Sequence, residues 1–302
     1  MFGLNKIIPV DSDYKFLNYR KNFYIISSIA IILSLILLLS KGLNLGIDFK
    51  GGTLIEVSTK NTNISELRDI LSPNFNEVSL QEFGDENNII IRLQNENNQE
   101  SIKTVNKVKQ LINDKVSEFR RSEFVGPTVS SELLWKGLQA ISFALFAILI
   151  YIWLRFEWQF GFGAVVALTH DVLFTLGVLS ILNIEFSLST IAAVLTIAGY
   201  SINDTVVIFD RVRENLRKYK NIELLDLFNM SINNTLSRTV MTSITTLLAL
   251  ISLYLFGGEV IKPFALTMII GVLVGTYSSI FIAVPTLLIF KFRPQDEDWF
   301  LI

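Results

Sequence analysis

Six apolar blocks, each about the length a helix needs to cross a bilayer, constrain the fold of this chain more than any other feature. A membrane-spanning helix requires about 20 predominantly apolar residues, and 51% of the 302 residues are hydrophobic. The blocks cover residues 23–40, 133–154, 160–182, 186–209, 239–256 and 264–290. We therefore expect an α-helical polytopic membrane protein with six transmembrane helices.

The scarcity of cysteine and histidine excludes several kinds of site. The chain contains no cysteine and a single histidine, His170, so disulfides, thiol catalysis and multi-histidine metal sites are ruled out. The formal net charge of −2 gives no reason to expect nucleic-acid binding. We expect neither a metal nor an organic cofactor, and these absences argue against a metal-dependent intramembrane enzyme.

The distribution of lysine and arginine predicts how the chain crosses the membrane. Basic residues occur before the first block, after the second and fourth blocks, and in the tail, whereas the third and fifth loops carry almost none. Basic short loops remain in the cytoplasm. We therefore expect cytoplasmic termini (1–22 and 291–302), a first helix at 23–40, an external domain at 41–132 and a five-helix bundle at 133–290.

The long first loop, residues 41–132, has the pattern of a small α+β domain. Strand-like runs occupy 53–58, 78–83, 88–94 and 123–129. Asn63 followed by Glu66 resembles a capping box at the start of a helix, and apolar residues spaced by three and four from Ile102 to Phe119 predict a second helix. The β-α-β-β-α-β order predicts a ferredoxin-like domain between helices 1 and 2.

A carboxylate lies inside the fourth block. Burying a charged side chain in a span costs about 2.5–3.5 kcal/mol on insertion scales. Its helical neighbours form one polar strip, which consists of Thr196, Tyr200, Asn203 and Asp204, with Ser201 at its border. Hydrogen bonds between helices would account for the hydroxyls. They account poorly for Asp204, for which we predict proton handling or charge pairing, with Tyr200 and Asn203 in support.

The third and fifth blocks also carry polar residues. His170 and Asp171 lie about ten residues from either end of the third block and are the deepest ionisable pair. Asp171 is either a second proton site or an acceptor between helices, and His170 is expected to be a neutral donor. Arg238 and Thr242 share a polar face of the fifth helix; Arg238 either snorkels to the interface or serves the site.

Four motifs occur in a fixed order relative to the six blocks. The first, GIDFKGGT at 46–53, contains Asp48, Gly51 and Gly52; the second, GPTVS at 126–130, begins with Gly126 and Pro127. The third is His170-Asp171, and the fourth comprises the paired segments 199–215 and 231–246. Together these motifs resemble the SecF proteins of the SecD/SecF protein-export family, part of the resistance-nodulation-division superfamily.

The resemblance implies partners and a role. It implies a homologous six-span SecD-like subunit, a twelve-span pseudo-symmetric heterodimer, and an association with the SecYEG channel and the translocating polypeptide in the bacterial inner membrane. Such a protein is no enzyme: protons are its coupling ion, and the proton-motive force promotes late translocation and release. Asp204 and Arg238 match the family positions on the proton route, to which we add Asp171 as a candidate.

Three other functions compete with this interpretation. A small-molecule or lipid exporter subunit of the same superfamily would be proton-driven too, but it predicts two large outer domains and usually twelve spans in one chain. An intramembrane hydrolase would use Ser201 or Ser243 with His170, yet no Gly-x-Ser-x-Gly context supports it. A structural scaffold would leave Asp204 unexplained.

Overall fold

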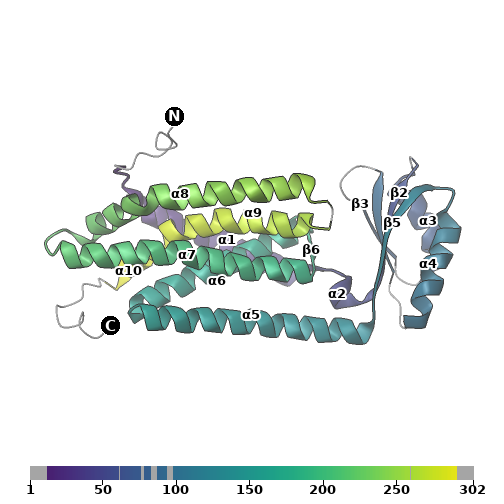
Figure 1. Ribbon diagram of the computed structural model, residues 1–302, viewed down its shortest axis with the longest axis horizontal. Coiled ribbons are helices and arrows are strands. Elements are labelled where there is room, and N and C mark those ends of the chain that lie inside the picture. Colours follow the sequence, from purple (N-terminus) through teal and green to yellow (C-terminus); the bar gives the residue numbers. More distant parts are fainter. Residues whose placement is uncertain are drawn as a thin grey trace. The chain divides into compact units, whose positions relative to one another are not determined.

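The computed structural model describes residues 12–290, apart from 61, 76–77, 83–86, 94–97 and 259. The chain divides into two units (Figure 1). The α/β unit comprises Asn44–Ala140 together with the short segment Glu185–Leu188. The helical unit comprises the described residues up to Leu43, Ile141–Ile184, and those from Ser189 onward.

Six helical segments of the described chain are long and apolar enough to cross a membrane, which confirms the six predicted spans. They are α1 (Arg20–Ser40, preceded by the 3-10 turn η2, Phe16–Tyr19), α5 (Pro127–Arg155), α6 (Trp158–Ile181), α7 (Leu188–Lys218), α8 (Leu224–Phe256) and α9 (Lys262–Ser278), the last continuing through the π-helical turn η3 (Ser279–Ala283) into α10 (Val284–Ile289). The chain is therefore a multi-pass membrane protein.

Several helix boundaries differ from the apolar blocks; α8, for example, begins at Leu224, well before the expected start at residue 239. The fourth block was expected to begin at Phe186, but this residue lies in β6 (Glu185–Phe186) and the helix begins at Leu188. At the other end, α7 continues to Lys218, so the basic segment expected to be a loop is helical. Hydropathy detects only the apolar part of a helix, whereas charged residues extend the same helix into water.

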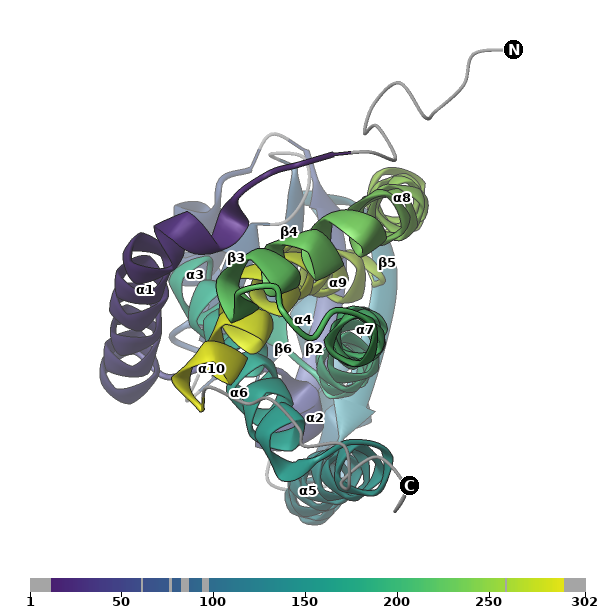
Figure 2. The ribbon, with the colours of Figure 1, turned by 90° about the vertical axis from the view of Figure 1, so that its left-hand side faces the viewer.

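The helices of the bundle approach one another closely at small residues. In Figure 2 the bundle is seen end on, with α6 and α9 between α1 on one side and α7 and α8 on the other. A Cβ added to Gly177 of α6 would collide with Ser34 of α1, and one on Gly163 would lie 2.9 Å from the Ala283 carbonyl oxygen. Small residues also meet in the sixth span, where Gly275 abuts Ser201 of α7.

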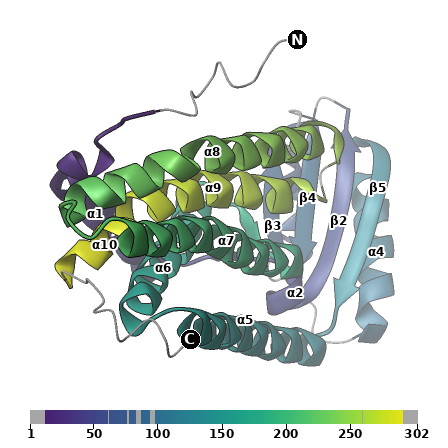
Figure 3. The ribbon, with the colours of Figure 1, turned by 60° about the vertical axis from the view of Figure 1, so that its left-hand side comes forward.

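The α/β unit contains one antiparallel sheet covered by two helices. Its elements are β2 (Gly52–Thr59), α3 (Ile64–Leu71), β3 (Val78–Glu82), β4 (Asn88–Leu93), α4 (Asn98–Ile112) and β5 (Val116–Val125). The strand order is β3-β4-β2-β5 (Figure 3). Apolar residues of β2 and β4, such as Ile55 and Ile91, pack with Leu67 of α3 and Val108 of α4. The β-α-β-β-α-β succession is present; the ferredoxin-like classification stays a prediction.

The expected helix and last strand of this unit were placed wrongly. The helix ends at Ile112 instead of reaching Phe119, and β5 begins at Val116 instead of residue 123. Val116 and Phe119 continue the helical spacing, but both pack on the sheet core from a strand that pairs with β2. Tertiary pairing therefore overrides the local pattern. Asn63 does cap α3, accepting a hydrogen bond from the Glu66 N–H at 3.0 Å.

Candidate functional site

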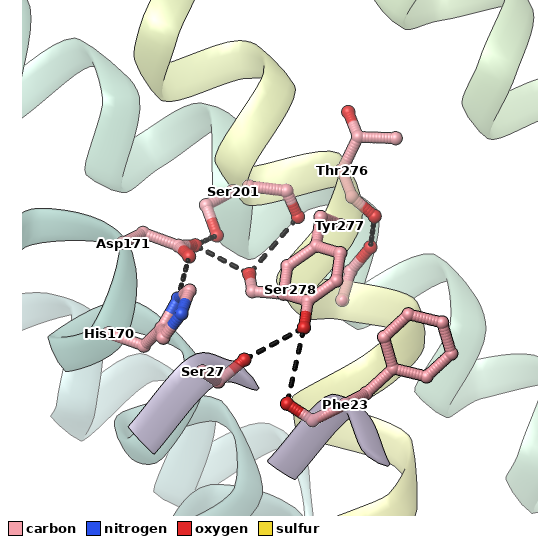
Figure 4. A network of polar contacts seen from close by, with 10 residues as sticks. Phe23, Ser27, His170, Asp171, Ser201, Thr276, Tyr277 and Ser278 are labelled. Carbon is pink, nitrogen blue, oxygen red and sulfur yellow. Dashed lines mark hydrogen bonds and ion pairs between the residues drawn. The ribbon is translucent and has the colours of Figure 1, made fainter. Parts of the chain in front are cut away.

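Asp171 joins three helices of the bundle through its carboxylate. The residue is fully buried on α6. Its Oδ2 accepts hydrogen bonds from the Ser201 hydroxyl of α7 at 2.5 Å and from the Ser278 hydroxyl of α9 at 2.6 Å, and its Oδ1 lies 3.0 Å from His170 Nδ1 (Figure 4). Of the two roles that the sequence left open, these contacts favour an acceptor between helices.

Further hydroxyl contacts extend from this cluster along α9. The Tyr277 hydroxyl lies 2.8 Å from Ser27 Oγ of α1 (Figure 4). On another side of α9, Thr276 Oγ1 lies 2.7 Å from Ser243 Oγ of α8, to which the Tyr200 hydroxyl donates at 3.4 Å. Consecutive residues of α9 thus bind α8, α1 and α6 in turn. The π-helical turn η3 begins directly after Ser278, and such turns occur frequently at functional sites.

Asp204 has a different environment from Asp171. Its side chain is 3% exposed, and its Oδ2 has no hydrogen-bond partner among the described residues. Arg238 forms no direct ion pair with it, but it lies close enough to act on the carboxylate through its charge. A buried carboxylate with an unmatched oxygen is costly. Of the two buried acids that the structure describes in the bundle, Asp204 is therefore the one that structural hydrogen bonds account for less well.

The other predicted site residues lie on the outer sides of α7 and α8. Asn203 and Arg238 are exposed, and Tyr200 is half-buried. The Thr242 hydroxyl donates to the Thr239 carbonyl oxygen of its own helix at 2.9 Å, so this bond does not bridge helices. The polar strip predicted on the fourth span therefore divides in two: the Ser201 hydroxyl bonds to Asp171, whereas Asn203 is exposed.

The glycine motif of the first loop forms a junction with the start of α7. Asp48 lies in α2 (Ile47–Lys50), and its Oδ2 accepts the Leu188 N–H at 2.9 Å, which caps the first turn of α7. β1 (Asn44–Leu45) pairs in parallel with β6, and Arg92 forms an ion pair with Glu185. The second half of the connection between the third and fourth spans, Glu185–Leu188, thus belongs to the α/β unit.

Gly51 and Gly52 have a conformational role beside this junction. Their φ angles are +73° and +113°, a region that non-glycine residues rarely adopt. The turn they form connects α2 with β2. The second motif lies against the first, because the Ser130 hydroxyl donates to the Ile47 carbonyl oxygen at 3.3 Å as well as to that of Gly126. Pro127 is the first residue of α5, where its missing N–H costs no helical hydrogen bond.

Several residues of the cluster were not found from the sequence. Ser278, Tyr277 and Ser27 look ordinary in apolar helices, and only the three-dimensional packing brings them to α6 and α1. The geometry also disfavours the hydrolase hypothesis. Ser201 donates to Asp171 rather than to His170, and Ser243 lies against Thr276, so neither serine has the histidine partner a nucleophile requires.

Family models match two parts of the chain. Residues 104–293 match the model described as "Protein export membrane protein SecD/SecF, C-terminal". Residues 36–62 match the SecD/SecF GG motif, which contains the Asp48 junction. The two matches together include the α7 and α8 residues and the residues around Asp171, except Ser27 of α1.

Named relatives and solved structures agree with these matches. Proteins named "Protein translocase subunit SecF" from Rickettsia rickettsii and Rickettsia bellii are each 45% identical over 297 residues, covering 97% of this chain and 96% and 98% of theirs. The crystal structure of SecDF from Thermus thermophilus matches 94% of this chain with a TM-score of 0.86 and 35% identity. A second SecDF structure, in a super-membrane-facing form, has a TM-score of 0.70 and 32% identity. This chain spans only 39% and 40% of those two longer chains. The chain belongs to the SecD/SecF family of protein-export membrane proteins.

Proposed function

We propose that this chain is an auxiliary subunit of the Sec preprotein translocase. With a SecD-like subunit, it uses the proton-motive force to promote late translocation and release of exported polypeptides. Similarity over nearly the full length to proteins named as translocase subunit SecF supports this proposal. The chain then acts as a proton-coupled export factor and not as an enzyme, with protons as its coupling ion and without a cofactor.

The observation that carries the proton-coupled mechanism is the buried carboxylate of Asp204. Its Oδ2 lacks a hydrogen-bond partner among the described residues, and Arg238 acts on it through charge without direct contact. A carboxylate in this setting has two states: neutral, and charged with the attraction of Arg238. Proton uptake from outside weakens that attraction, and release to the cytoplasm restores it. Asp171 contributes by holding α6, α7 and α9 together.

The partner surface follows from polar residues that face outward. Asn203 of α7 is exposed, as are Arg238 and Thr245 of α8. Lipid would be an unfavourable neighbour for these groups. We assign this face to a SecD-like helical subunit, since the two SecDF chains that this chain resembles are more than twice its length. The SecYEG channel and the translocating polypeptide are further partners in the proposal.

The proposed orientation places the α/β unit outside the bacterial inner membrane. The basic loops predict cytoplasmic termini. This alternation puts the first and third loops on the same side, and Glu185–Leu188 of the third loop does belong to the same unit as the first. The α/β unit then faces the side on which exported polypeptides emerge.

The Asp204→Asn variant tests the proton-coupled mechanism. The amide keeps the shape of the side chain and cannot titrate, so export into proteoliposomes should lose its dependence on an imposed proton gradient. Asp204→Glu, which retains a titratable group, should keep part of the gradient dependence. Asp226→Asn, at the exposed start of α8, is the matched control and should keep all of it. Full gradient dependence in the Asp204→Asn protein would refute the mechanism.

A crosslinking experiment tests the partner surface. Because the natural chain has no cysteine, a cysteine introduced at Asn203 is unique and can carry a short crosslinker. In native membranes it should capture a SecD-like subunit, whereas a cysteine at Leu33, an exposed apolar residue of α1, should not. Equal capture from both positions would contradict the assignment of this face.

The exporter alternative makes different predictions. A small-molecule or lipid exporter subunit would move its substrate without a nascent polypeptide. The near full-length match to translocase subunits favours the export function over this alternative. Copurification through a crosslinker in the α/β unit separates the two, because only a translocase subunit should recover channel subunits.

A further inference from the structure

A cavity of about 380 Å³ lies where α5 ends and the charged part of α7 begins. Its walls carry four basic and two acidic side chains, namely Arg155, Asp210, Arg213, Glu214, Arg217 and Lys218. None of these residues belongs to the Asp204 site or the Asp171 cluster. The cavity therefore requires its own explanation.

The acidic residues of this cavity are already engaged. Asp210 forms an ion pair with Arg155 at 2.9 Å. Glu214 pairs at 2.8 Å with Arg211, which does not line the cavity. The lining therefore has an excess of positive charge, and one of its carboxylates is shared with a cation outside it.

Arg213 is the cation that most needs a counter-ion. It is 9% exposed, and its Nη1 donates to the Arg155 carbonyl oxygen at 3.1 Å. Its guanidinium also lies 5.9 Å from the centre of the Phe156 ring. No carboxylate among the described residues pairs with it. A nearly buried cation beside an open cavity is stabilised by an anion that binds there, and guanidinium groups match phosphate oxygens in a bidentate geometry.

The position of the cavity along the spans indicates where such an anion comes from. Arg155 is the last residue of one apolar span, and Trp158 begins the next. The cavity thus lies at the level of the lipid headgroups, where basic pockets between helices bind anionic lipids.

We propose that this cavity binds a phosphate group, and that the group is the headgroup phosphate of an anionic lipid. Arg213 is the central ligand, with Lys218 and Arg217 at the rim. A zwitterionic phosphatidylcholine headgroup should bind less well, because its choline cation would meet the same basic residues.

Native mass spectrometry of the full-length protein in detergent tests the proposal. With equal amounts of phosphatidylglycerol and phosphatidylcholine, the natural protein should retain phosphatidylglycerol preferentially. Arg213→Gln should weaken this retention about tenfold, the size expected for a charge-assisted hydrogen bond, and Lys218→Gln at the exposed rim should weaken it about fivefold. Lys21→Gln, which removes an exposed cation from α1, should leave it unchanged.

The outcomes distinguish the source of the phosphate and guard against misfolding. If circular dichroism shows that Arg213→Gln fails to fold, the loss of phosphatidylglycerol retention in Lys218→Gln tests the proposal instead. Equal retention of both lipids would overturn the proposal, and so would an equal loss in the Lys21→Gln protein. Displacement of phosphatidylglycerol by an equimolar amount of inorganic phosphate would overturn the lipid source. Export activity is not part of the readout, so the result is independent of the proposed function.

Discussion

Replacing Asp171 with asparagine separates the two roles open to this residue. Asparagine keeps one carbonyl oxygen, which can accept both serine hydroxyls that now donate to Oδ2. Its amide group can donate to His170 Nδ1 once the imidazole proton resides on Nε2. The variant therefore retains the contacts between helices while losing the ability to carry a proton.

The expected loss of stability follows from the number of contacts. Asp171 accepts two hydrogen bonds from side chains of other helices, and polar contacts between membrane helices contribute about 0.6 kcal/mol on average and up to about 1.7 kcal/mol each. Asp171→Leu removes both, together with the contact to His170 on its own helix, and should lower the free energy of unfolding by about 1 to 3 kcal/mol. Asp171→Asn should cost less than about 1 kcal/mol.

Two measurements on the same proteins decide between the roles. Unfolding in sodium dodecyl sulfate, followed by circular dichroism, should rank Asp171→Asn close to the natural protein and Asp171→Leu well below it. Gradient-dependent export in proteoliposomes should persist in Asp171→Asn. A stable Asp171→Asn protein that loses gradient dependence would refute the acceptor role and place this residue on the proton route. Equal stability of Asp171→Leu and the natural protein would refute the energetic reasoning.

Three further predictions concern packing and helix ends. Gly275→Leu should push α9 away from α7, because an added Cβ would lie 3.0 Å from that of Ser201. This overpacking should lower the free energy of unfolding by about 1 to 3 kcal/mol, as measured by unfolding in detergent. Gly199→Leu is the control, because a Cβ added at Gly199 meets open space. Asp48→Ala should cost about 1 kcal/mol of local stability, seen as faster hydrogen exchange at the first turn of α7. Asn63→Ala should likewise cost about 1 kcal/mol at α3, and unchanged exchange at either helix would contradict the capping assignments.

The sequence predicts the spans of this protein better than their ends. Six apolar blocks suffice to locate six helices, because bilayer thickness sets their length. The same criterion cannot distinguish an apolar strand residue such as Phe186 from the helix that follows it. Hydropathy also gives no sign that α7 continues as a charged helix to Lys218. In the α/β unit, Val116 and Phe119 show that helical spacing can continue by coincidence into a strand.

Individual ionisable residues were recognisable in the sequence, but their contacts were not. A carboxylate in an apolar block is conspicuous, which is why Asp171 and Asp204 were found. The environment of Asp171 differs from that of Asp204 because Ser278 and Ser201 donate to Asp171. Serines are unremarkable in membrane helices, since their hydroxyls commonly bond to the backbone of their own helix. Asp48 was found only as part of a motif, and its bond to the first turn of α7 requires a contact between segments 140 residues apart.

In the proposed mechanism, α7 carries Asp204 together with two residues, Leu188 and Ser201, that bond to other parts of the chain. Ser201 lies less than one turn before Asp204 on the same helix and is bonded to Asp171. About 24 Å of helix, at 1.5 Å per residue, separates Asp204 from the first turn, which Asp48 caps. Hydrogen bonds are directional, so a rotation or shift of α7 that accommodates the charged carboxylate strains the bond between Ser201 and Asp171. In the proposed mechanism, a protonation event at Asp204 therefore acts on the bundle through Asp171.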